Sequence, residues 1–467
     1  MRSRPVRLQH APSQAREDGL VAPQVLVVGG GLAGVSAAAA LRQAGCGVQL
    51  LEREAHAGGR AAGSSRDGFR LDAAPFLVSA RERRLLGLIA TAGLGERLLP
   101  LRPVILSHAR GGRIEPAPPA GRRLEVARIG GVRLLEALRL HRLARLERRF
   151  AGLLDPEAPE RAVRLDDRSV ADFVRLYFGA SVLAHWAEPI LGSDLLSDAA
   201  EASRVSFLLA RRARGAAPLA TLRGSPAEVA DALWLRGTDR LGVEVRGLEW
   251  TAQEVSLDTT SGRFRADAIV LALPAAETLR VAEAVLAPAE REGLAAARSA
   301  PAIVLNAALE RAPARKATRV RVPSAEGSPL ATIAVEPGGV GAPAPAGAAL
   351  VSLVARPDWA RAHLEADGAV IEKALLAALE RVFPHAVGTI RFVEIRRYAH
   401  AVPRFDVGRY RQLARLFARQ AEQRAAGRRL YFAGDHWLGP TLDAAVASGR
   451  RAATELCADF GLPAPRS

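Results

Sequence analysis

Residues 25–34, VLVVGGGLAG, decide the fold that we predict for this chain. The first four are apolar and mostly β-branched, which is typical of a buried parallel strand, and an alanine-rich helical stretch then runs to about Ala44. Between them, Gly29, Gly31 and Gly34 have the spacing G-x-G-x-x-G. In such a turn the first glycine permits a tight bend, the second lets the backbone approach a pyrophosphate, and the third lets the helix pack on the strand. Because the helix N-terminus also presents free N–H groups to phosphates, the sequence predicts a dinucleotide-binding βα unit.

A second apolar strand, residues 48–51, ends at Glu52. An acid at this place, about 20 residues after the glycine turn, accepts hydrogen bonds from the adenosine ribose hydroxyls and repels a 2′-phosphate. We therefore predict a dinucleotide that lacks this phosphate, and NADP is disfavoured.

The remainder of the chain divides into a helical part and strand-rich parts. Residues 106–214 are helix-rich and full of arginine, and Ser169 with Asp172 forms a capping box that opens a helix ending near Gly179. Other strands are expected at 243–245, 268–273, 302–308, 348–354 and 430–433, other helices at 132–150, 369–382 and about 442–456, and a loop at 337–347.

Charge and composition bound the class of protein. The 467 residues carry a net charge of +16, but the basic residues are almost all arginines that are scattered rather than clustered with aromatics, so no nucleic-acid partner is expected. Residues 1–22 predict a flexible basic arm that lacks the apolar region of a secretory signal, and no apolar run is long enough to span a bilayer. With two cysteines, Cys46 and Cys457, we expect a reducing, cytoplasmic location.

Residues 28–60 carry a resemblance to a known group of enzymes. Gly58, Gly59 and Arg60 follow Glu52 closely, and the whole stretch resembles the opening of the flavin amine oxidase, protoporphyrinogen oxidase and phytoene desaturase superfamily. The resemblance implies non-covalent FAD, with Arg60 reaching the pyrophosphate and flavin region. A guanidinium fork suits a pyrophosphate well, which agrees with that role.

Later segments extend the resemblance over about 23–456, most closely to the protoporphyrinogen oxidase and carotenoid desaturase branches. The resemblance implies that the Val245 backbone pairs with adenine, that Asp435 contacts the ribityl chain, and that the helix starting near Leu442 aims its amides at the flavin, where negative charge gathers on reduction. The expected cofactor-binding residues are Gly29, Gly31, Leu32, Ala33, Gly34, Glu52, Arg53, Gly58, Gly59, Arg60, Val245, Gly434, Asp435, Thr441, Leu442 and Ala444.

The resemblance also implies the fold class and the domains. We expect an α/β fold, a Rossmann-like FAD-binding domain of the two-dinucleotide-binding type with an interleaved α+β substrate domain. The FAD-binding domain is predicted to comprise 23–105, 215–285 and 400–460, and the substrate domain 106–214 and 286–399, with its helical part as a candidate membrane-facing surface. In residues 133–149, however, leucines and arginines interleave around the helix, which does not support a clean interfacial helix.

The strand at 301–309 bears on which reaction the protein catalyses, because it lacks a residue that is typical of amine oxidases. Amine oxidases of the superfamily typically hold a lysine there and an aromatic residue near the position of Thr441, and this chain has neither. We therefore expect removal of hydride from a large apolar or conjugated substrate, by phytoene-type desaturation or protoporphyrinogen-type oxidation. Hydroxysqualene-type dehydroxylation, amine oxidation and a non-catalytic FAD-binding partner of a biosynthetic complex are the alternatives.

The partners and catalytic groups follow from the same resemblance. The electron acceptor is expected to be oxygen or a quinone, the substrate to be hydrophobic, and contact with the inner face of the cell membrane stays open. No metal site is expected. Five residues are candidates for a place near the flavin and substrate, without an assigned role: His436, Trp437, Tyr398, His400 and Arg404.

Overall fold

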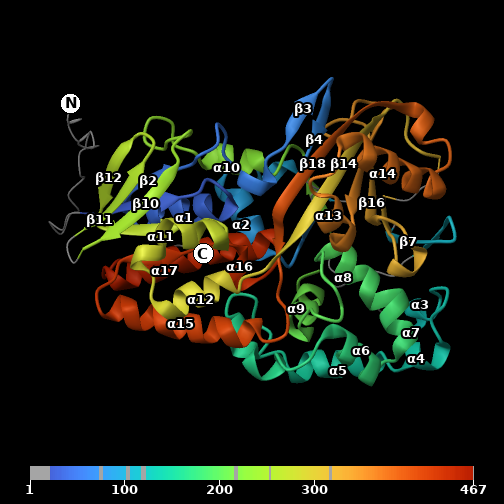
Figure 1. Cartoon of the computed structure of the whole chain (residues 1–467), viewed down its shortest axis with the longest axis horizontal. Helices are drawn as coiled ribbons and strands as arrows, with labels where there is room; N and C mark the ends of the chain where they lie inside the picture. Colours follow the sequence, from blue (N-terminus) through green and yellow to red (C-terminus); the bar gives the residue numbers. More distant parts are fainter. Residues whose placement is uncertain are drawn as a thin grey trace.

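The computed structural model describes residues 22–72, 77–100, 106–116, 123–214, 219–251, 254–314 and 318–465. The arm predicted at 1–22 lies, except for Ala22, outside these residues. Figure 1 shows two parts side by side: a layered part that holds both the first described strands and the last helix, and a second part that contains a large sheet and a group of helices.

A four-stranded parallel sheet, in the order β19-β13-β1-β2, forms the centre of the first part. The strands are β1 (Gln24–Val28), β2 (Gly47–Leu51), β13 (Ala268–Leu271) and β19 (Leu430–Phe432). Helices α1 (Leu32–Gln43) and α17 (Leu442–Asp459) cover one face, where Val25, Val27 and Val270 join the core. The apolar runs of the sequence become strands because both faces of this sheet are buried.

The other face of the parallel sheet packs against a meander and three helices. The meander is β10 (Val245–Trp250), β11 (Val255–Thr259) and β12 (Gly262–Ala266), and the helices are α11 (Ala275–Ala282), α12 (Pro288–Ala295) and α15 (Arg409–Ala425). The strand predicted at 243–245 is wrong except for its last residue. The Val243 N–H donates to the Glu52 carbonyl at 2.8 Å, so this segment holds the end of β2 before the meander begins.

A seven-stranded sheet, in the order β18-β14-β17-β16-β15-β7-β8, dominates the second part. Helices α13 (Pro357–His363) and α14 (Gly368–Val382) pack on one face of it. The predicted strands at 302–308 and 348–354, the helix at 369–382 and the loop at 337–347 are confirmed, whereas β18 was not foreseen. The strands are β7 (Leu106–Arg110), β8 (Arg113–Pro116), β14 (Ser299–Leu309), β15 (Arg319–Arg321), β16 (Leu330–Pro337), β17 (Ala349–Ala355) and β18 (Ile390–Pro403).

In the helical part, one predicted helix is wrong. The single helix predicted at 132–150 is two helices, α4 (Leu134–Leu138) and α5 (His141–Arg149). The side chains of Ala137, Leu140 and Leu143 are all buried in the core. On a straight α-helix, side chains three residues apart point in directions that differ by about 60°, so a straight helix would turn the three progressively apart. The break between α4 and α5 brings all three inward. The predicted cap is confirmed, because the Ser169 hydroxyl accepts from the Asp172 N–H at the start of α6 (Val170–Tyr177).

The remaining elements are short. The hairpin β3 (Ser64–Arg66) and β4 (Phe69–Leu71) reaches toward the seven-stranded sheet, and no described helix is both long and apolar enough to cross a membrane. The other elements are α2 (Arg83–Thr91), α3 (Arg123–Val126), α7 (Ala180–Val182), α8 (Glu188–Asp194), α9 (Arg204–Arg214), α10 (Ala227–Leu233), α11 (Ala275–Ala282), α12 (Pro288–Ala295), α13 (Pro357–His363), α14 (Gly368–Val382), α15 (Arg409–Ala425), α16 (Asp435–Leu438), β5 (Val78–Ser79), β6 (Leu98–Pro100) and β9 (Leu219–Leu222).

Candidate cofactor site

The glycine turn between β1 and α1 has the geometry that a pyrophosphate requires. Gly29 has a φ of 106°, and a Cβ there would lie 2.5 Å from the Ala272 carbonyl oxygen, so no other residue fits. A Cβ on Gly31 would meet nothing within 4 Å, so the space above it is open. Gly31 is also the N-cap of α1 and makes no side-chain cap. The free amides and the open space fit a phosphate group at the start of α1.

Two other glycines bring the two ends of the chain together. A Cβ on Gly34 would lie 1.8 Å from the Gly29 carbonyl oxygen, and one on Gly449 would lie 2.1 Å from the Ala33 carbonyl oxygen. The first contact holds α1 close to its own turn, and the second holds α17 against α1. The expected residues Leu32 and Ala33, buried at the start of α1, therefore lie at the contact between the two halves of the site.

Glu52 lies directly beside the glycine turn. Its side chain is buried, and its carboxylate accepts from the Gly30 N–H at 2.6 Å and from the Glu54 N–H at 2.9 Å. The contact with Gly30 places the carboxylate on the glycine turn, and its predicted role as the ribose-binding acid stays a prediction. The neighbouring Arg53 is 56% exposed and pairs with Glu54, whereas Val245 is buried at the start of β10, two residues after the segment that bonds to Glu52.

Arg60 and Asp435, which are far apart in the sequence, form an ion pair. The Arg60 guanidinium donates to the Asp435 carboxylate at 2.8 Å and to the Ala401 carbonyl at 2.8 Å, and the carboxylate further raises the pKa of Arg60. The guanidinium is still 38% exposed, so it has room for a further acceptor. The structure thus brings together a phosphate-type donor and the acid expected at the ribityl chain.

Backbone contacts fix both partners of that ion pair. The Gly58 N–H donates to the Gly30 carbonyl at 2.9 Å, and Gly59 lies against Gly31, so the segment before Arg60 is held on the glycine turn. Gly434 has a φ of 137°, and its N–H donates to the Ser448 hydroxyl at 2.8 Å. Ser448 was missed by the sequence reasoning, although it directly precedes Gly449.

The N-terminus of α17 is well defined. The Thr441 hydroxyl accepts from the Ala444 N–H at 3.1 Å, with Leu442 between them. Asp443 accepts from the Leu85 N–H at the start of α2, and burial raises the pKa of Asp443 to about 6. The first turn of α17 is therefore anchored on one side, and its start follows directly on the segment that carries Asp435.

His436 and Trp437 lie on α16, immediately after Asp435, and both are buried. Burial lowers the pKa of His436 to about 3, so its imidazole is neutral. Trp437 packs between Phe432 and Phe417 in the core. Within the described residues, neither His436 Nε2 nor Trp437 Nε1 has a hydrogen-bond partner.

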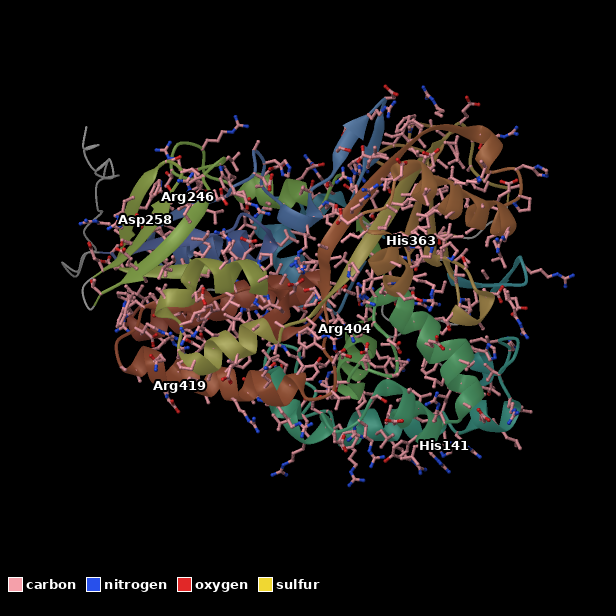
Figure 2. All side chains as sticks on the ribbon, in the orientation of Figure 1. His141, Arg246, Asp258, His363, Arg404 and Arg419 are labelled. Atoms are coloured by element: carbon pink, nitrogen blue, oxygen red, sulfur yellow. The ribbon has the colours of Figure 1, made fainter. Side chains whose placement is uncertain are left out.

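The other three candidates belong to β18 or to the residue that follows it. Tyr398 pairs with Ala302 of β14, and His400 lines a cavity of about 370 Å³. Arg404 forms ion pairs with Asp406, at 3.0 Å, and with Glu201. Figure 2 places Arg404 in the middle of the molecule, where the two parts meet. The residue of this stretch that reaches Arg60 is Ala401, through a backbone carbonyl that leaves no signature in the sequence.

The fold and this site together define the class of flavin-dependent oxidoreductases. Residues 32–457 match the family of flavin containing amine oxidoreductases, and the chain belongs to this family. Its cofactor is FAD, as predicted, and the predicted superfamily and Rossmann-like fold class are confirmed. The roles of single cofactor-binding residues and the domain boundaries stay predictions, and among the described residues no cluster of side chains suits a metal ion.

Two curated relatives match parts of the chain. The carotenoid phi-ring synthase of Streptomyces griseus is 33% identical over 201 residues, which are 40% of this chain and 38% of the relative. The carotenoid 3,4-desaturase of Haloarcula japonica is 53% identical over 51 residues, 11% of this chain and 10% of the relative. The chain thus matches well under half the length of either relative.

Solved structures resemble the chain over nearly its full length. A putative protoporphyrinogen oxidase from Exiguobacterium sp. 255-15 has a TM-score of 0.74 at 19% identity and covers 95% of this chain and 100% of its own. Cyclohexylamine oxidase from Brevibacterium oxydans has a TM-score of 0.72 at 18% identity, with 94% and 100% covered. These neighbours show the fold and do not distinguish between substrates.

Proposed function

We propose that this flavoprotein removes hydride from a large apolar or conjugated substrate, with carotenoid-type desaturation as the leading reaction. The observation that carries the proposal is a buried apolar cluster beside Arg60, which we propose forms an apolar wall of the substrate site. Ala302 and Val304 of β14 cluster there with Val354 and Leu196. Ala401, whose carbonyl binds Arg60, packs against the same cluster.

The strand that forms this wall supports hydride removal from carbon over amine oxidation. β14 (Ser299–Leu309) is the strand in which a lysine would mark an amine oxidase, and its polar residues are Ser299, at its start, and Asn306. Asn306 is fully buried and already used, since it donates to the Asp72 carbonyl and accepts from the Ser352 hydroxyl. FAD supplies the redox chemistry when it is bound, and an apolar wall orients a polyene and excludes water without acid–base groups.

The two curated relatives favour the same substrate class, because both are named for carotenoids. Protoporphyrinogen-type oxidation and hydroxysqualene-type dehydroxylation share the requirement for an apolar wall and are the next candidates. Oxygen or a quinone as electron acceptor, and contact with a membrane surface, are further parts of the proposal.

Anaerobic reduction of the flavin tests the substrate directly. The FAD-loaded protein would be mixed with phytoene, protoporphyrinogen, hydroxysqualene or a primary amine, with free FAD as the control. We expect fast loss of oxidised-flavin absorbance with phytoene and none with the amine. Bleaching by the amine alone would refute the proposal, and no bleaching by any compound would indicate a non-catalytic FAD-binding partner. Re-oxidation by air or by a quinone then identifies the acceptor.

A further inference from the structure

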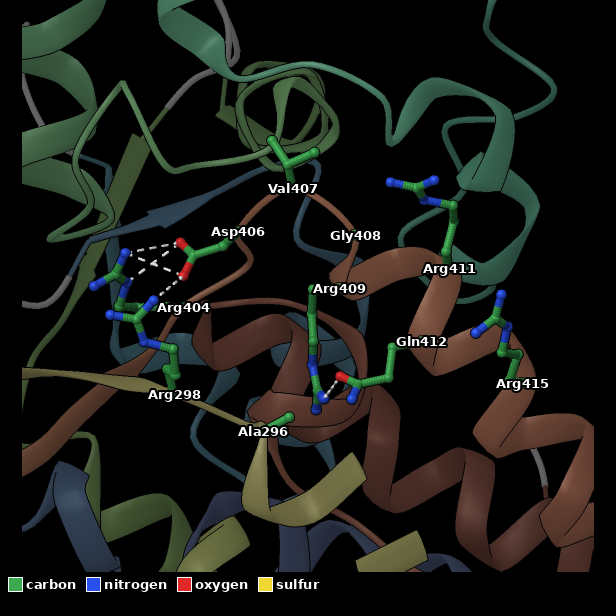
Figure 3. A pocket seen from close by; sticks show the side chains of 10 residues that line it. All are labelled: Ala296, Arg298, Arg404, Asp406, Val407, Gly408, Arg409, Arg411, Gln412 and Arg415. Atoms are coloured by element: carbon green, nitrogen blue, oxygen red, sulfur yellow. Dashed lines mark hydrogen bonds and ion pairs between the residues drawn. The ribbon is translucent and has the colours of Figure 1, made fainter. Parts of the chain in front are cut away.

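A second hollow, apart from the glycine turn, lies where β18 ends and α15 begins (Figure 3). It encloses about 540 Å³. Five arginines line it, against a single carboxylate, that of Asp406. The arginines are Arg298, Arg404, Arg409, Arg411 and Arg415.

The positive charge of this hollow is only partly balanced. Asp406 and Glu201 form ion pairs with Arg404 and Arg298 on one side of the hollow. On the opposite side, Arg411 and Arg415 have no ion pair or side-chain hydrogen bond with any described residue. They lie one turn apart on α15, where like charges repel each other. The five guanidinium groups therefore have two carboxylates as partners, Asp406 in the lining and Glu201 outside it.

Arg409, on the same helix, is a buried cation without a counter-ion. Its side chain is 6% exposed and donates to three neutral acceptors: the carbonyls of Gly293 and His436 and the amide oxygen of Gln412. It makes no ion pair within the described part of the chain. Buried charges are normally paired, because their desolvation is costly. An unpaired buried arginine next to two unpaired exposed ones indicates that a negative charge belongs in this hollow.

We propose that the hollow binds an anion of the phosphate or diphosphate class, either free or as the headgroup of a lipid. Arginine forks match tetrahedral oxyanions in geometry and charge. Arg411 and Arg415 supply the outer contacts, and Arg409 supplies the charge at the base. Because Arg409 also donates to the His436 carbonyl, next to Asp435, the bound anion is linked to the flavin end of the cofactor site.

Calorimetric titration of the FAD-loaded protein with pyrophosphate tests the site, since saturation with FAD blocks the cofactor's own phosphate contacts. The variant R411Q/R415Q removes two exposed arginines of the hollow. The control R246Q/R311Q removes the same charge from exposed arginines elsewhere that also lack partners among the described residues. We expect pyrophosphate binding to weaken at least about tenfold in R411Q/R415Q and to stay unchanged in the control.

A variant that is expected to bind pyrophosphate more tightly distinguishes a loss of binding from a loss of folding. Glu201→Gln removes a half-exposed carboxylate that competes for Arg298 and Arg404, so pyrophosphate should bind more tightly than to the wild type. The lipid source is tested with phosphatidylcholine vesicles with and without phosphatidic acid. Selective loss of binding to the acidic vesicles in R411Q/R415Q would identify a headgroup. Equal weakening in both arginine pairs, or no selective binding of pyrophosphate or acidic vesicles, would overturn the proposal.

Discussion

Replacing Gly449 by alanine would force α17 away from α1. The added Cβ would lie 2.1 Å from the Ala33 carbonyl oxygen and 2.9 Å from the Ala37 amide nitrogen, whereas ordinary contacts begin at 3.4 Å. Both neighbours are backbone atoms inside a helix, so a side-chain rotation cannot relieve the clash. The helices must therefore separate by more than 1 Å along their contact.

We expect Gly449→Ala to lower the free energy of unfolding by about 1–3 kcal/mol, the usual cost of overpacking in a core. FAD should also bind less tightly, because α1 and α17 carry the two halves of the site. Denaturant unfolding of the FAD-free protein and a FAD titration measure the two effects. Gly87→Ala is the matched control: Gly87 is exposed inside α2, its Cβ would meet nothing within 4 Å, and alanine there should stabilise by roughly 0.5–1 kcal/mol. Equal stability of G449A and wild type would refute the reasoning.

Two further predictions concern the flavin end of the site. Asp435→Asn should weaken FAD binding by about 1.5–3 kcal/mol, as expected for a hydrogen bond to a charged group. Asp258→Asn, at a half-exposed carboxylate that pairs with Arg263, should not, and equal Kd values of the two variants from flavin fluorescence would contradict the assignment. Burial lowers the pKa of His436 from 6.5 to about 3, so between these pH values only the unfolded chain takes up a proton at this residue. The free energy of unfolding is therefore unaffected by His436 above about pH 6.5 and falls as the pH falls toward 3. The FAD-free wild type should thus lose about 2 kcal/mol between pH 6.5 and pH 5 relative to His436→Gln, and parallel stability curves for the two proteins would disprove this.

The elements that could be predicted from the sequence are those whose signal is local. The strand and helix around Gly29 were found because buried apolar runs, glycines and alanines stand next to one another. β18 was missed because most of its side chains are only partly buried, so no apolar run marks it. Its pairing with β14, distant in the sequence, makes it a strand. The helix α15 carries so many arginines that its buried face, with Leu413 and Leu416, was not recognised.

In the candidate site too, residues in short local motifs could be predicted, and contacts with distant segments could not. Glu52, Arg60 and Asp435 were each predicted from short motifs, and the structure places Glu52 on the glycine turn and pairs Arg60 with Asp435. Their partners could not be predicted, because Ala401 contributes a backbone carbonyl. The charged surroundings of Arg404 likewise depend on Glu201, which comes from the helical part of the chain.

The ion pair between Arg60 and Asp435 also bears on how the protein is made. Its partners are 375 positions apart, and the parallel sheet is completed by β19, which follows every other strand in the chain. At a synthesis rate of about 5–20 residues per second, Arg60 is made roughly 20–75 seconds before the acid that it pairs with. From the time that β13 has been made, it exposes the edge that β19 later covers. An FAD site that uses both Arg60 and Asp435 is therefore complete only after the C-terminal segment has been translated, and until then the N-terminal half carries an unpaired strand edge.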